Sequence, residues 1–123
     1  MKDRGVDAEG REPFRQGVEQ FNAERFFDAH ESWEAIWLKA AEPDKTFLQG
    51  ITQVTAAFHH LAQGNRAGAE SLLQKGLRKL EQFPANYRGI KLDQLREELG
   101  GWLGMLAQNE AGRKGLRPKI EWH

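Results

Sequence analysis

Two ionisable residues, His30 and Glu34, are four positions apart in the stretch Phe26–Trp37, which reads FFDAHESWEAIW. A helix advances about 100° per residue, so this spacing places both side chains on one face. An imidazole and a carboxylate placed in this way can chelate zinc, iron or manganese, or can form a hydrogen-bonded pair. On the same helical wheel both residues fall within the apolar arc, and we expect them to be buried.

The next predicted helix carries further groups that could join this site. Gln53 and His60 lie on one face of that helix, and His59 lies at the edge of its apolar stripe. The candidate metal ligands are therefore His30, Glu34 and His60, with His59 as the alternative to His60. The pattern HExxE differs from the HExxH of zinc proteases, in which both histidines bind the metal.

A structural role explains the same residues equally directly. Glu34 would accept a hydrogen bond from His30, and Trp33 and Trp37 would donate from their indole N–H groups. Such a buried network would fix the packing of the helices without catalysis. The residues favour a noncatalytic binding or scaffold domain, and the alternative is a metal-dependent hydrolase or redox enzyme in which Glu31 acts as a base.

The composition excludes several classes of function. Lys plus Arg and Asp plus Glu are equal, at 18 each in 123 residues, so we expect no nucleic-acid partner. The absence of cysteine excludes disulfides, thiolate nucleophiles and thiolate metal ligands. No stretch is long and apolar enough to cross a membrane, and the charged start MKDRGVDAEGRE has no apolar leader. The expected compartment is the cytoplasm, with no membrane partner.

Nucleophilic catalysis finds little support in the sequence. Ser32 is expected on the outer face of its helix, Ser71 has no histidine nearby, and neither lies in a glycine elbow. No glycine-rich phosphate loop is present. We therefore expect no cofactor, with a divalent metal as the alternative.

Hydrophobic spacing predicts an all-α fold. Apolar residues recur at intervals of three and four, and no segment shows the alternation of strands between hairpin turns. Residues 1–12 are expected to form a flexible arm, and residues 13–123 a single antiparallel helical bundle, in which tetratricopeptide-like hairpins are one arrangement. The predicted helices cover roughly residues 13–22, 25–41, 45–63, 66–82 and 93–106.

Single residues predict local features of this bundle. Asp44 is expected to cap the third helix, and Asn65, after Gly64, the fourth. Gly76 can permit close contact between helices. The tail RPKIEWH is too short for a helix and is expected to lie extended across the bundle.

A stripe of mainly amide and imidazole side chains on the third predicted helix suggests a partner surface. These residues follow at spacings of four, three and four on the side opposite the apolar stripe, and they are Gln49, Gln53, Ala56 and His60. Homo-oligomerisation or docking on a larger protein through this stripe is a third hypothesis.

The stretch FFDAHESWEAIW, followed by FLQGITQVTAAFHHLAQGN and GAESLLQKGLRKL, resembles the small all-helical family known as domain of unknown function 309. The resemblance covers roughly residues 14–120, and its most specific element is HExWExxW at residues 30–37. It implies a compact helical fold. It implies no activity, because the family is itself uncharacterised.

Overall fold

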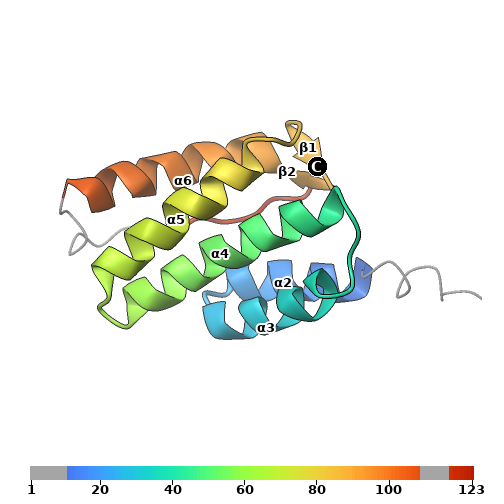
Figure 1. Cartoon of the computed structure of the whole chain (residues 1–123), viewed down its shortest axis with the longest axis horizontal. Coiled ribbons are helices and arrows are strands. Elements are labelled where there is room, and N and C mark those ends of the chain that lie inside the picture. The colour runs from blue at the N-terminus through green and yellow to red at the C-terminus, as the bar shows by residue number, and fades with distance from the viewer. Residues whose placement is uncertain (1–10, 109–116) are drawn as a thin grey trace, which may run out of the picture.

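The computed structural model describes residues 11–108 and 117–123, which pack around one hydrophobic core. The predicted all-α class is confirmed, because strand structure in these ranges is limited to one short hairpin (Figure 1). The elements follow in the order α2 (Arg11–Asn22), α3 (Phe26–Trp37), α4 (Asp44–Ala62), α5 (Arg66–Leu80), β1 (Asn86–Tyr87), β2 (Ile90–Lys91) and α6 (Leu92–Ala107).

α4 is the central helix of the array. It packs against α3 on one side and α5 on the other, while α2 packs on α3 and α6 packs on α5 (Figure 1). A helix covered on two sides needs a wide apolar surface, and the buried residues of α4 include Phe47, Leu48, Ile51, Val54 and Phe58. α3 consequently lies at an edge of the array, with one face open to solvent. No helix in the described ranges has both the length and the apolar character needed to cross a membrane.

Two helix boundaries differ from the prediction. α3 ends at Trp37, four residues before the predicted end at Ala41, and a short turn leads to Pro43. α2 begins at Arg11, within the predicted arm, whose residues 1–10 lie outside the described part of the chain.

The turn between α4 and α5 has the predicted form. Gly64 has a φ of 83°, a conformation that favours glycine. The Oδ1 atom of Asn65 accepts a hydrogen bond from the backbone N–H of Gly68 at 3.0 Å. The predicted cap of this helix is therefore confirmed.

The predicted cap at Asp44 is wrong, because a different side chain serves the start of α4. Oε1 of Glu42 accepts the backbone N–H of Thr46 at 3.0 Å. Asp44 is the first residue of α4 and accepts a hydrogen bond from the Tyr87 hydroxyl at 2.6 Å. Asp44 thus joins α4 to the hairpin.

Tyr87 is expected to ionise only at strongly alkaline pH. Burial, and then the hydrogen bond donated to the Asp44 carboxylate, raise the pKa of Tyr87 to about 12. Since this value lies above the ordinary pKa of about 10, the contribution of Tyr87 to stability is complete below pH ~10 and is lost as the pH rises toward ~12. Tyr87 is the only tyrosine in the sequence, so the absorbance of tyrosinate reports on it alone. Asp44→Asn should lower the midpoint, and a wild-type midpoint near 10 in the folded protein would show that the contact does not form.

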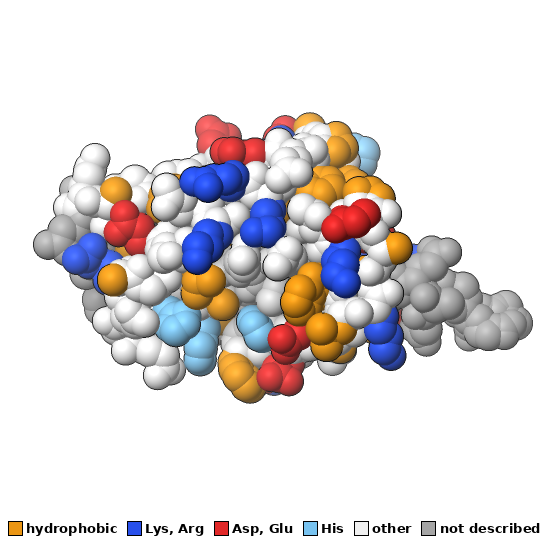
Figure 2. All heavy atoms as spheres, in the orientation of Figure 1, with side chains coloured by type: hydrophobic (Ala, Val, Ile, Leu, Met, Phe, Trp, Pro, Cys, Tyr) orange, Lys and Arg blue, Asp and Glu red, His pale blue; other side chains and the backbone are white. Residues whose placement is uncertain are grey.

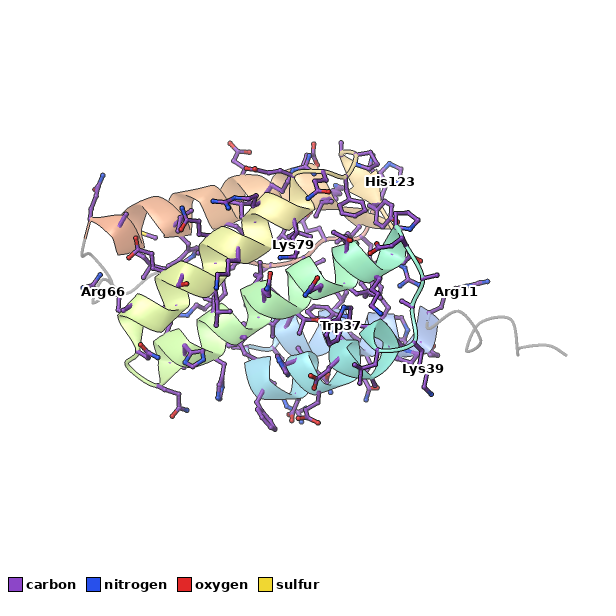
Figure 3. The ribbon with its side chains drawn as sticks, in the orientation of Figure 1. Arg11, Trp37, Lys39, Arg66, Lys79 and His123 are labelled. Carbon is purple, nitrogen blue, oxygen red and sulfur yellow. The ribbon has the colours of Figure 1, made fainter. Side chains whose placement is uncertain are left out.

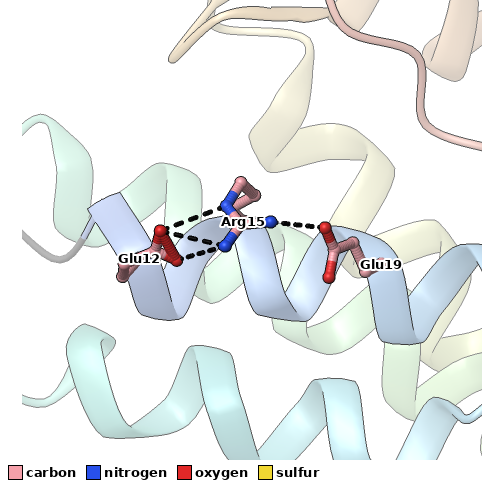
Figure 4. Close-up of polar contacts among 3 residues, drawn as sticks. All are labelled: Glu12, Arg15 and Glu19. Carbon is pink, nitrogen blue, oxygen red and sulfur yellow. Dashed lines mark hydrogen bonds and ion pairs between the residues drawn. The ribbon is translucent and has the colours of Figure 1, made fainter.

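α2 carries an exposed network of charges along one side. Arg15 binds Glu12 in the preceding turn at 2.6 Å and Glu19 in the following turn (Figure 4). The hydrogen bond and charge of Glu12, together with the charge of Glu19, raise the pKa of Arg15. These pairs are three and four residues apart, which is the spacing that supports a helix at its surface.

Close packing of α4 on α5 depends on two facing glycines. A Cβ atom added to Gly76 would lie 2.7 Å from the carbonyl oxygen of Gly50 and 2.8 Å from Cγ2 of Val54. A Cβ added to Gly50 would lie 3.2 Å from the carbonyl oxygen of Gly76. The backbones therefore touch at this crossing, which agrees with the contact expected from Gly76.

Gly76→Ala should lower the free energy of unfolding by about 1–3 kcal/mol, because the two helix backbones must move apart. Gly104→Ala is the matched control, since an added Cβ there meets nothing within 4 Å and alanine favours a helix by up to about 1 kcal/mol. Urea unfolding measures both values. Equal stability of the two variants would contradict the close crossing.

The indole of Trp33 joins α3 to α2. This side chain is fully buried, and its Nε1 donates a hydrogen bond to the backbone carbonyl of Phe14 at 3.2 Å. The ring lies directly over Gly17, where an added Cβ would fall 2.3 Å from Nε1. Trp33 is therefore a core residue, and the position of α3 depends on it.

The hairpin and the tail close one end of the array. The two residues between β1 and β2, Arg88 and Gly89, have φ angles of 49° and 81°, as in the tight turns that join twisted strands. The sequence did not predict this hairpin. The tail is extended as predicted: the Asn22 side chain accepts the N–H of Ile120 at 2.7 Å and donates to its carbonyl at 2.9 Å. Trp122 then pairs with β2, next to the marked C-terminus in Figure 1.

Candidate functional site

Three potential metal ligands lie together on α3. One ligand atom from each of His30, Glu31 and Glu34 can be chosen so that all three lie within 4.8 Å of one another. His30 and Glu34 are half-buried, and Glu31 is exposed. Glu34 follows His30 by four residues and Glu31 by three, and these two spacings bring side chains together on one side of a helix.

A small cavity adjoins this group between α3 and α4. Its volume is about 160 Å³, and it is lined by Phe27, His30, Ala56, His59 and His60. His30 belongs to both the ligand group and the cavity. Figure 2 shows histidine, acidic and hydrophobic side chains gathered at the lower edge of the molecule, over α3 and the adjoining part of α4.

Phe27 forms an exposed wall of this cavity. Its side chain is 55% exposed, and the centroid of its ring lies 5.7 Å from that of His59. No sequence pattern indicated that this ring would remain exposed. Ala56, with its small side chain, lines the cavity together with Phe27 and the three imidazoles.

The expectation that His30 and Glu34 are both buried is wrong. Both are half-buried at the surface, because among the described elements only α2 and α4 pack closely on α3. A helical wheel identifies an apolar arc, but not how much of that arc a neighbouring helix covers. The group is therefore accessible to a ligand from solvent.

The predicted hydrogen-bonded network is not formed by these residues. Trp33 donates to Phe14 instead, and the buried Nε1 of Trp37 has no hydrogen-bond partner in the described part of the protein. Figure 3 labels Trp37, between α3 and α4. Nδ1 of His30 is also buried without a partner there. A buried polar atom without a partner lowers the stability of the fold by about 1–3 kcal/mol. Nδ1 therefore does not hold the ring in place, and the packing of its neighbours does.

Gln53 is placed away from the ligand group. Its Oε1 accepts a hydrogen bond from Nζ of Lys79 on α5 at 3.2 Å. The half-buried residues Gln49, Gln53, Ala56 and His60 form a strip along α4 between its two neighbouring helices. Within that strip, only Ala56 and His60 line the cavity.

The N-cap of α5 sets the proton position of His60. Oδ1 of Asn65 is committed to the N–H of Gly68, so its Nδ2 faces Nδ1 of His60 at 3.1 Å. An amide nitrogen can only donate, and Nδ1 must therefore be the acceptor. In the neutral ring the proton is then on Nε2, which makes His60 a hydrogen-bond donor. His60 lies outside the close ligand group on α3.

The hydroxyl groups near the site are already engaged. Ser32 donates to Oε1 of Gln20 at 2.7 Å on the side that faces α2. Thr52 and Thr55 donate to carbonyls of their own helix, at 2.6 Å and 2.8 Å. None of these is a hydroxyl activated by a histidine.

Comparison with known proteins finds one family. Residues 14–72 match the family Domain of unknown function (DUF309). The resemblance seen in the sequence is thus confirmed over this range. It includes most of α2, all of α3 and α4, and every residue of the ligand group and the cavity, so the site lies within the matched range.

The chain is also similar to an uncharacterised protein of Aquifex aeolicus (strain VF5). The two sequences are 29% identical over 101 residues, which cover 81% of this chain and 30% of the relative. The chain therefore spans about a third of the length of the relative it matches. Neither the family description nor the name of this relative gives an activity.

Proposed function

We propose that this DUF309 domain is a noncatalytic binding module that holds one divalent transition-metal ion through His30, Glu31 and Glu34. The observation that supports the proposal is the grouping of their ligand atoms within 4.8 Å. Ligand atoms about 2.1 Å from a tetrahedral ion lie about 3.4 Å from one another. Small side-chain rotations on α3 would be enough to close the group around an ion.

The types of ligand favour a particular class of ion. One imidazole nitrogen and two carboxylate oxygens suit zinc, manganese or iron better than calcium, which prefers six or more oxygen ligands. Nδ1 of His30 has no hydrogen-bond partner in the described part of the chain. This is consistent with a ring positioned for a ligand rather than for a protein hydrogen bond. Two carboxylates also balance the charge of a divalent ion.

A metal-dependent hydrolase or redox enzyme is the second candidate function. It is favoured by the number of ligands, because catalytic zinc sites commonly combine three protein ligands with an open position for water. In this group, however, Glu31 would be needed as a ligand and could not act as the base. The exposure of Glu31 also leaves the ion in water, where its effect on a bound group is weakest. Hydrolysis of nitrophenyl esters and phosphates by the metal-loaded protein distinguishes the two functions.

Thermal unfolding with and without zinc tests metal binding. An ion that binds only the folded state stabilises it by about 2.7 kcal/mol at a hundred times its Kd, so the Tm should rise by several degrees. The rise should be reversed by a chelator and absent in His30→Ala. An unchanged wild-type Tm, or an equal rise in His30→Ala, would exclude the site.

A further inference from the structure

We infer that the cavity between α3 and α4 binds a small oxyanion, which completes the coordination of the ion and accepts a hydrogen bond from His60. This inference rests on the proposed metal site and deepens it. The occupant would be a carboxylate or a phosphate group. His30 provides the connection, because it belongs to both the ligand group and the wall of the cavity.

The size of the cavity suits such a group. A cavity of about 150 Å³ accepts a molecule as large as benzene, and the volume here is about 160 Å³. A phosphate or acetate, with four or five heavy atoms, would fit in this space. The wall that α4 provides contains Ala56, His59 and His60, with no acidic residue among them.

The donor in that wall is fixed by the structure of the next turn. Asn65 holds Nδ1 of His60 as an acceptor, because its own Oδ1 caps α5 at Gly68. Nε2 is then the ring atom that carries the proton and remains for a ligand. Hydrogen bonds to ionised acceptors are about twice as strong as neutral ones, so an oxyanion is the preferred occupant.

The same charges require the ion to bind first. Glu31 and Glu34 together carry two negative charges, which repel an oxyanion from the metal-free site. A divalent ion cancels them, and its open positions then attract oxygen ligands. Oxyanion affinity should therefore depend on the metal, which would not be true of a basic surface patch.

The test uses the full chain loaded with cobalt(II), whose visible spectrum reports on the ligands of the ion. Acetate and phosphate are titrated in parallel, so the stronger spectral response identifies the preferred class. His60→Phe should weaken the binding of the preferred oxyanion by at least about tenfold. His60→Gln, which keeps an N–H donor, should recover part of it, and neither variant should change the cobalt affinity.

The outcomes separate this inference from the proposed function. If cobalt does not bind, the metal site is absent and the inference fails with it. If cobalt binds but neither oxyanion changes its spectrum, the inference alone is wrong. Equal oxyanion affinity in wild type and His60→Phe, or in metal-free and cobalt-loaded protein, would also overturn it.

Discussion

Gly17→Ala is expected to lower the free energy of unfolding by about 3 kcal/mol, the upper end of the usual cost of overpacking a core. The added methyl group would overlap the indole of Trp33, whose Nε1 would lie 2.3 Å from the new Cβ. An indole cannot yield at this point without losing its hydrogen bond to Phe14 and its packing between α2 and α3. The midpoint of urea unfolding, followed by circular dichroism, measures the change.

Gly101→Ala is the control for this substitution. An added Cβ at Gly101 meets nothing within 4 Å, so alanine should stabilise α6 by up to about 1 kcal/mol. The two glycine-to-alanine changes should thus have opposite signs. Unchanged stability of Gly17→Ala would mean that Trp33 does not lie over Gly17.

His30→Ala is expected to reduce zinc affinity by at least about a hundredfold, because one of three ligands is lost and two carboxylates on one helix remain. Glu34→Gln should have a smaller effect in the same direction, since an amide oxygen is a weaker ligand than a carboxylate. Nδ1 of His30 has no hydrogen-bond partner in the described part of the chain. Removal of the imidazole therefore leaves no other buried group unpaired at Nδ1, and His30→Ala should remain folded. Isothermal titration with zinc measures the affinities.

His123→Ala is the control for the loss of an imidazole. His123 is exposed in the tail and lies outside the ligand group. The zinc affinity of His123→Ala should therefore equal that of the wild-type protein. Equal loss in His30→Ala and His123→Ala would indicate nonspecific binding by surface histidines.

Much of the fold follows from local physical rules in the sequence. The spacing of apolar residues predicted every helix from α2 to α6 to within a few residues of its start, because each helix buries a periodic face. Asn65 and Gly76 were assigned their roles by the rules for caps and close helix contact. These features depend on residues near one another in the chain, or on the size of one side chain.

The errors arose where distant parts of the chain decide the outcome. Glu42 serves the start of α4 in place of Asp44, which is the first residue of the helix and accepts a hydrogen bond from Tyr87 of the hairpin. Gln53 is held by Lys79 of α5, a contact that no pattern within α4 could indicate.

The candidate site shows the same limit of sequence reasoning. The spacing of His30 and Glu34 correctly placed them on one side of α3, but their exposure depends on the position of α3 at the edge of the array. The role of Phe27 as an exposed cavity wall has the same origin. α3 therefore has two different faces: Trp33 fixes the helix against α2, and the opposite region carries the ligand group.

The most direct test of the proposed metal site is the amount of metal bound by the purified protein. Equilibrium dialysis against zinc, manganese and iron(II), followed by elemental analysis, should give one equivalent of one of these ions per chain in wild type. His30→Ala, dialysed in parallel, should retain little. Less than about a tenth of an equivalent in wild type, at concentrations well above the Kd expected of protein zinc sites, would contradict the proposed metal site.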